Sequence, residues 1–301
     1  MSTSNTGVNP TNVGEHSKRP GSKMASPDDP FREIENEHGE PFIDWKHPLN
    51  LHPWYFAHQA LRVDFEDNLA ILDKMISAIE IGVYCRYFTN FKFSKSTRLN
   101  TLLLRWMTHN YMKFTALQLD FMHHHHEMED KVIFPLMATK MAIDPNIGKD
   151  HQEVAIRCNL IDKKTKALLS SPNLLDSYKE IRVEMVALRD VLEPHLQEEE
   201  LKWLPALLRK FTKDEISVVE RPATRDLPWA TLPHYYRRLS KAERESHMIE
   251  IFGMPRFVVI WILAGNFKKY DDIYRSCINE LMNPDLREEN MRSNSSGCVI
   301  A

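Results

Sequence analysis

Two short motifs in the sequence combine a histidine and a glutamate at a spacing that can do metal chemistry. They are His125-x-x-x-Glu129 and His195-x-x-x-Glu199, and the second follows the first by 70 residues. Residues four apart lie one above the other on the face of an α-helix. Imidazole nitrogens suit iron or zinc, and a carboxylate can bridge two cations. The repeat therefore predicts a metal centre.

Two further histidines and two prolines extend the repeat. His58 lies in Ala-His-Gln-Ala-Leu and His151 in Asp-His-Gln-Glu-Val, and each begins an apolar helical stripe. Pro135 and Pro205 follow the two glutamates at the same interval, and Pro135 is expected to end or kink its helix. Each half of the pattern thus has one inward histidine followed by one His-x-x-x-Glu motif.

Four consecutive histidines at 123–126 leave a second register open, His126-x-x-x-Asp130. The interval from glutamate to proline is the same in both halves, and this favours His125 and Glu129 as the inward pair. The other histidines of the run are interpreted as solvated or as lying behind the ligands. The histidines without partner spacing are interpreted as structural: His47, His52, His109, His234 and His247.

Four amphipathic stretches must position these residues. Their apolar side chains recur every three or four residues, and a helix stop with a new cap is expected at 170–173. The predicted fold is all-α, an up-and-down four-helix bundle with a C-terminal helical extension. The helical legs from His151 to this break and from the break to His195 are similar in length, which predicts that the two histidines lie at similar heights.

Composition narrows the classes of function. The net charge of −3 gives no reason to expect nucleic acid. Four cysteines without CxxC spacing are typical of reduced thiols in a cytoplasmic protein, and Cys158 is expected in the core. No secretory signal is visible, and the apolar stretch 257–264 is too short to span a bilayer.

Three segments resemble a known family. They are 122–135, with its His run, Glu129 and Pro135, the block 195–205, and Ala57-His-Gln-Ala-Leu-Arg62. Together they resemble the hemerythrin-like HHE cation-binding domain, over about residues 50–212. The resemblance implies a four-helix bundle with a non-haem di-iron centre. Its implied metal ligands are His58, His125, Glu129, His151, His195 and Glu199.

The sequence departs from the oxygen-carrying hemerythrins at two positions. Ala155 stands where they have a second histidine one turn after the first. Glu199 lies four residues after its histidine, where they have an aspartate at five. These departures argue against oxygen transport and leave metal binding in place.

The predicted function is a di-iron protein that binds or senses iron, oxygen, nitric oxide or reactive oxygen species. One alternative is a di-iron oxidase or peroxidase, with Tyr111 as a distant candidate proton donor. Another is a helical scaffold stabilised by its metal. Zinc and manganese are weaker candidates than iron, and the paired E-x-x-H motifs of ferritin-like proteins are absent from the core helices.

The expected organisation has four parts: a disordered arm at 1–45, the HHE domain at 50–212, a helical extension at 213–285 and a flexible tail at 286–301. The sequence closes on Cys298-Val-Ile-Ala, a C-a-a-X pattern associated with farnesylation. No polybasic segment precedes it, so the expectation is weak, reversible membrane association of a cytoplasmic protein. The sequence predicts no particular protein partner.

Overall fold

The computed structural model describes residues 41–88, 95–144, 146–224, 230–250 and 253–283. Every regular element within these ranges is a helix, which confirms the all-α prediction. Most of the predicted arm at 1–45 and the whole predicted tail at 286–301 lie outside the described residues.

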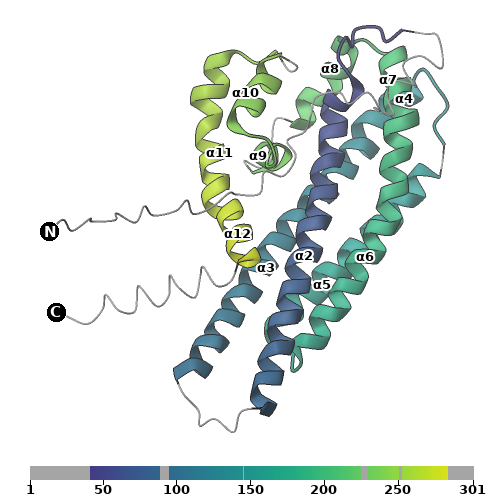
Figure 1. Cartoon of the computed structure of the whole chain (residues 1–301). Helices are drawn as coiled ribbons and strands as arrows, with labels where there is room; N and C mark the ends of the chain where they lie inside the picture. Colours follow the sequence, from purple (N-terminus) through teal and green to yellow (C-terminus); the bar gives the residue numbers. More distant parts are fainter. Residues whose placement is uncertain (1–40, 89–94, 145, 225–229, 251–252, 284–301) are drawn as a thin grey trace, which may run out of the picture. The chain divides into compact units, whose positions relative to one another are not determined.

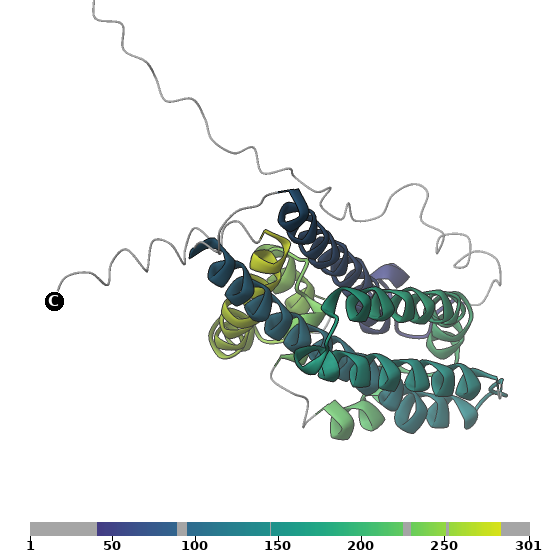
Figure 2. The same cartoon turned by 90° about the horizontal axis from the view of Figure 1, so that it is seen from below.

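Four long helices form the bundle: α2 (Pro53–Phe88), α3 (Lys95–Met128), α5 (Ile147–Ala167) and α6 (Leu174–Glu198). Helix α2 packs against α3 and α6, and α5 packs against the same two helices. Each helix therefore has two neighbours around a shared core (Figure 1), and Figure 2 shows them closer to end-on.

The core is built from the apolar stripes that the sequence predicted. Leu61 and Leu72 of α2, Val154 of α5 and Leu188 of α6 are all buried in one hydrophobic cluster. The predicted cap is also present, because the side-chain oxygen of Asn173 accepts a hydrogen bond from the backbone N–H at the start of α6. Burial of these stripes holds the four helices in the register that the site requires.

Two helices of the bundle pass through a π-helical turn near their ends. The turn η2 (Glu129–Ile133) joins α3 to α4 (Phe134–Ala138), and η4 (Glu199–Trp203) joins α6 to α7 (Leu204–Lys210). In each turn the N–H of the following residue bonds to the carbonyl of the glutamate five positions earlier. Proline comes next and has no N–H for an α-helical bond. The π turn thus lets the helix continue where Pro135 was expected to end or kink it.

Shorter helices flank the bundle in the sequence. The 3-10 helix η1 (Leu49–Leu51) precedes it. After it come α8 (Lys213–Thr224), α9 (Thr231–Tyr235), α10 (Lys241–Glu250), η5 (Val258–Leu263), α11 (Ala264–Tyr270), η6 (Asp271–Arg275) and α12 (Ser276–Met282). The helices from α8 to α12 lie within 213–285, the range where a helical extension was expected. Helix α9 packs on α2, and α12 packs on α2 and α3. Within the described ranges, none of the helices combines the length and apolar character needed to cross a bilayer.

Candidate metal centre

The six side chains predicted as ligands meet at one end of the bundle. His58 and His151 lie near the starts of α2 and α5, whereas the two His-x-x-x-Glu motifs lie where α3 and α6 run into their π turns. All six residues are buried: His58, His125, Glu129, His151, His195 and Glu199. Helices of matched length bring these residues together from segments far apart in the sequence.

Each of the two glutamates directs its two oxygens to different histidines. In Glu129, Oε1 lies 3.1 Å from Nε2 of His125, and Oε2 lies 3.7 Å from Nε2 of His151. In Glu199, Oε2 lies 3.2 Å from Nε2 of His58, and Oε1 lies 3.3 Å from Nε2 of His195. A carboxylate divided in this way is suited to bridge two cations.

Two groups of ligand atoms result, and within each group the atoms lie within 4.8 Å of one another. One group consists of His58, His125, Glu129 and Glu199. The other consists of His126, Glu129, His151 and His195. Glu129 belongs to both groups, and Glu199 reaches His195 and His151 as well. Each group could hold a metal ion, and the two groups share Glu129.

His126 is the member of these groups that the sequence interpretation placed outside the ligand set. It is buried, and its ring centroid lies 4.6 Å from that of His151 and 5.5 Å from that of His195. His123, by contrast, is exposed. The neighbours His125 and His126 therefore face the two groups separately. The competing His126 register was the sequence signal that could have identified it.

The electrostatic environment favours neutral imidazoles and penalises free carboxylates. Burial raises the pKa of Glu129 and of Glu199 well above the usual carboxyl value, and in Glu199 the charge of Glu129 raises it further. Burial lowers the pKa of His58 and of His125 well below the usual imidazole value. Neutral imidazole is the form that ligates metal, and a cation would offset the cost of two buried carboxylates.

Several atoms of the cluster are buried without a hydrogen-bond partner among the described residues. They include Nε2 of His58, His125 and His126, Oε2 of Glu129 and both side-chain oxygens of Glu199. Nε2 of His151 and Nε2 of His195 also face each other at 3.0 Å. Buried polar atoms normally have partners, so convergent atoms of this kind fit metal ions.

Aromatic side chains cover the cluster beside the π turns. Trp54, Phe134 and Trp203 are buried, with ring centroids 6.2 Å apart between the first two and 6.4 Å between the last two. The indole N–H of Trp54 donates a hydrogen bond to Oε1 of Glu129. The cover is apolar apart from its indole N–H groups, which limits the access of water.

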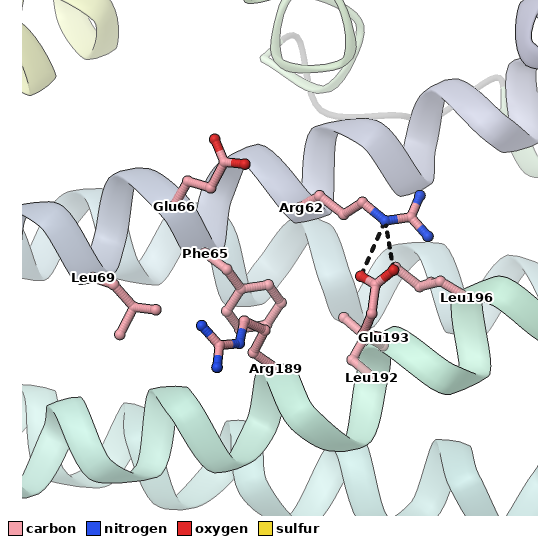
Figure 3. Close-up of a pocket in the computed structure, with 8 residues that line it drawn as sticks. All are labelled: Arg62, Phe65, Glu66, Leu69, Arg189, Leu192, Glu193 and Leu196. Carbon is pink, nitrogen blue, oxygen red and sulfur yellow. Dashed lines mark hydrogen bonds and ion pairs between the residues drawn. The ribbon is translucent and has the colours of Figure 1, made fainter. Parts of the chain in front are cut away.

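A surface groove lies between α2 and α6, beside the cluster. It has a volume of about 260 Å³, and Arg62, Phe65, Arg189 and Glu193 are among the residues that line it. Figure 3 shows the guanidinium of Arg62 on α2 directed toward the carboxylate of Glu193 on α6. Nε of Arg62 lies 3.1 Å and 3.0 Å from the two oxygens of that carboxylate.

The other residues considered from the sequence lie away from the cluster or outside the described part. Tyr111 is buried in the bundle core, where its hydroxyl donates to Asn68. Cys158 is also a core residue, as predicted, and burial raises the pKa of its thiol to about 12. His109 is exposed. Cys298 lies outside the described residues.

Comparison with known proteins gives one match. The model of the hemerythrin HHE cation binding domain matches residues 109–207. Neither the curated proteins nor the solved structures contain a match to the chain. The matched stretch begins within α3 and ends within α7, so it includes both His-x-x-x-Glu motifs and His151 but not His58. Residues 109–207 of this chain are therefore similar to the hemerythrin HHE cation binding domain.

Proposed function

We propose that this chain binds two iron ions in the centre formed by α2, α3, α5 and α6, and that the centre binds or senses a small oxidant or diatomic molecule. The observation that carries the proposal is the division of Glu129 and Glu199 between two groups of histidines. A single ion would need only one such group. The proposed ligands are the six predicted residues together with His126.

The donor set supports iron over a closed zinc site. The first group offers two imidazoles and the second offers three, and the glutamates add oxygens to both. Mixed imidazole and carboxylate donors are typical of non-haem iron, whereas structural zinc takes a closed tetrahedral set, often of thiolates. When bound, iron would supply reversible redox chemistry and positions open to an exogenous ligand.

The residues around the cluster favour binding over turnover. Its histidines are buried, aromatic side chains cover it, and Tyr111 is engaged elsewhere in the core. Among the described residues, the indole N–H of Trp54 donates a hydrogen bond to Glu129. Indole N–H does not exchange its proton readily as an acid, so this chain's own residues orient and shield the ligands. A di-iron oxidase or peroxidase is the second candidate, and a metal-stabilised scaffold is the third.

The first test is metal analysis of the protein purified from its own cells. We expect about two ions per chain, mostly iron, and loss of metal with a lowered melting temperature in His195→Ala and in Glu199→Ala. His123→Ala is the control, because His123 is exposed. A single zinc ion that survives His125→Ala would contradict the proposal.

A second experiment separates the three candidate functions. The reduced, metal-loaded protein is mixed in a stopped-flow instrument with oxygen, nitric oxide or peroxide. A reversible spectral change supports binding or sensing, and repeated turnover supports an enzyme. Absence of any spectral response supports a scaffold.

Membrane association is proposed separately, on the sequence pattern at Cys298 alone. A single prenyl group would give weak and reversible binding to a membrane. Intact-mass measurement on the protein from its own cells tests it. An unmodified C-terminus on a protein found wholly in the soluble fraction would exclude lipidation and leave the metal proposal unchanged.

A further inference from the structure

Each bridging glutamate is followed in sequence by a second carboxylate that contacts a histidine of the opposite half of the bundle. Asp130 follows Glu129, and its Oδ1 lies 2.8 Å from Nδ1 of His151. Glu200 follows Glu199, and its Oε1 lies 3.0 Å from Nδ1 of His58. Asp130 and Glu200, here called the outer carboxylates, are therefore also related by the 70-residue repeat. Each of them contacts a histidine of the other helix pair, where α2 and α3 form one pair and α5 and α6 form the other.

A carboxylate at Nδ1 has a direct effect on the other nitrogen of the ring. It accepts the Nδ1–H hydrogen bond, which leaves the Nε2 lone pair free. Nε2 of His58 then faces Glu199 at 3.2 Å, and Nε2 of His151 faces Glu129 at 3.7 Å. The hydrogen bond also fixes the orientation of the ring and makes Nε2 a stronger donor to a cation.

The two outer carboxylates lie in different environments. The Asp130 side chain is 49% exposed, whereas that of Glu200 is 7% exposed. Water can replace a lost contact at Asp130 but has little access to Glu200. A buried carboxylate needs its own partner, and Glu200 has one in Arg62.

Arg62 binds Glu200 with both terminal nitrogens. Its Nη1 and Nη2 lie 2.6 Å and 3.1 Å from the two oxygens of Glu200. Its Nε is directed to Glu193 on the wall of the groove (Figure 3). A two-pronged arginine–carboxylate pair is geometrically specific. A chain of contacts thus runs from the groove through Arg62 and Glu200 to His58.

We propose that Arg62 and Glu200 are positioning residues that hold His58 for the ion in its group, and that Asp130 contributes much less to His151. This inference rests on the proposed metal centre. It makes retention of one of the two ions depend on Arg62, whose hydrogen bonds go to Glu193 and Glu200. The ion bound by His126, His151 and His195 depends less on its outer carboxylate.

The test is release of iron from the fully loaded protein into excess chelator. We compare the wild-type protein with Arg62→Gln, Glu200→Gln and Asp130→Asn. We expect one of the two ions to leave about 10- to 100-fold faster in the first two variants. This is the range typical for changes to residues that hydrogen-bond to a metal ligand. Asp130→Asn should release both ions at nearly the wild-type rate.

Arg189→Gln is the matched control. Arg189 lines the same groove but pairs with Asp190 at the surface, so the same chemical change should leave both release rates unaltered. Melting of the metal-free proteins is measured in parallel. A variant that is merely less stable would lose both ions together and melt lower without metal, whereas a mispositioned His58 affects one ion.

The possible results distinguish failure of the positioning roles from failure of the proposed metal centre. A wild-type protein that takes up no metal overturns both. A wild-type protein with two ions, and with equal release rates in Arg62→Gln and Arg189→Gln, overturns the positioning roles alone. So does a joint loss of both ions with a lowered metal-free melting temperature, or an Asp130→Asn effect as large as that of Glu200→Gln.

Discussion

Nε2 of His234 lies 2.9 Å from Oδ2 of Asp64, and both side chains are fully buried. Asp64 is on α2 of the bundle, and His234 is on α9, which follows it. Arg237 reaches the other oxygen of Asp64 at 2.5 Å, and the hydroxyl of Tyr270 lies 2.6 Å from Nδ1 of His234. This buried polar network connects the C-terminal helices to the helix that carries His58.

Replacement of Asp64 by asparagine should destabilise the protein markedly. Arg237 would keep Asp67 at 2.8 Å but lose its fully buried partner, and breaking a buried ion pair costs about 3 kcal/mol or more. Urea unfolding measures the effect. Arg238→Gln is the control, because the pair between Arg238 and Glu66 is exposed and should contribute less than about 1 kcal/mol. Equal midpoints for the two variants would contradict the prediction.

His126→Ala should lower the metal content by about one ion per chain. The residue belongs to the group with His151 and His195, and no other imidazole among the described residues takes its place there. Elemental analysis after loading with excess iron measures the loss. His123→Ala, an exposed neighbour in the same run, should keep both ions. Full metal content in both variants would exclude His126 as a ligand.

The helical fold and the burial of the six residues predicted as ligands could be predicted from the sequence because they obey a single rule. Each of the six lies on an apolar stripe, and a polar side chain on such a stripe must be buried. The 70-residue repeat then identifies the members that act together. These patterns are local in the sequence, so they can be recognised without knowing how the helices pack.

The remaining features depend on contacts between distant segments. His126 follows His125 and points about 100° away from it around the helix. A single apolar stripe therefore predicts that only one of them is buried. The packing of α5 and α6 buries both. Glu200 lies in a run of glutamates that could be a solvated face. It is buried because Arg62, 138 residues away, binds it. The π turns likewise precede Pro135 and Pro205, and at Pro135 the sequence predicted only an end or a kink of the helix.

Tyr111→Phe should leave metal binding intact and lower stability. The hydroxyl donates to Oδ1 of Asn68 at 2.9 Å, and Asn68 in turn donates to Gln118 at 2.6 Å. Removing the donor leaves a buried acceptor unpaired, at a cost of about 1–3 kcal/mol. Tyr111 is about 20 Å along α3 from His125. Iron content and the stopped-flow traces should therefore match the wild type, and a selective loss of turnover would instead support a proton-donor role.

The metal-free protein should become less stable as the pH falls, and His52 should contribute to this loss. Nδ1 of His52 accepts the backbone N–H of Trp54 at 3.2 Å, and burial, followed by the charge of His58, lowers the pKa of His52 from 6.5 to about 3. Below pH 6.5 the unfolded chain binds a proton at this residue that the folded chain does not. The contribution of His52 to stability is therefore present above pH 6.5 and is lost as the pH falls toward 3.

His52→Asn tests this contribution, since asparagine can still accept the Trp54 N–H but does not titrate. Unfolding free energies of metal-free wild type and variant, measured from pH 7 to pH 4, should converge as the pH falls or cross in favour of the variant. The difference should change by up to about 1.4 kcal/mol per pH unit for one proton. Parallel curves across this range would show that His52 binds its proton equally well in the folded and unfolded chain, contrary to its burial.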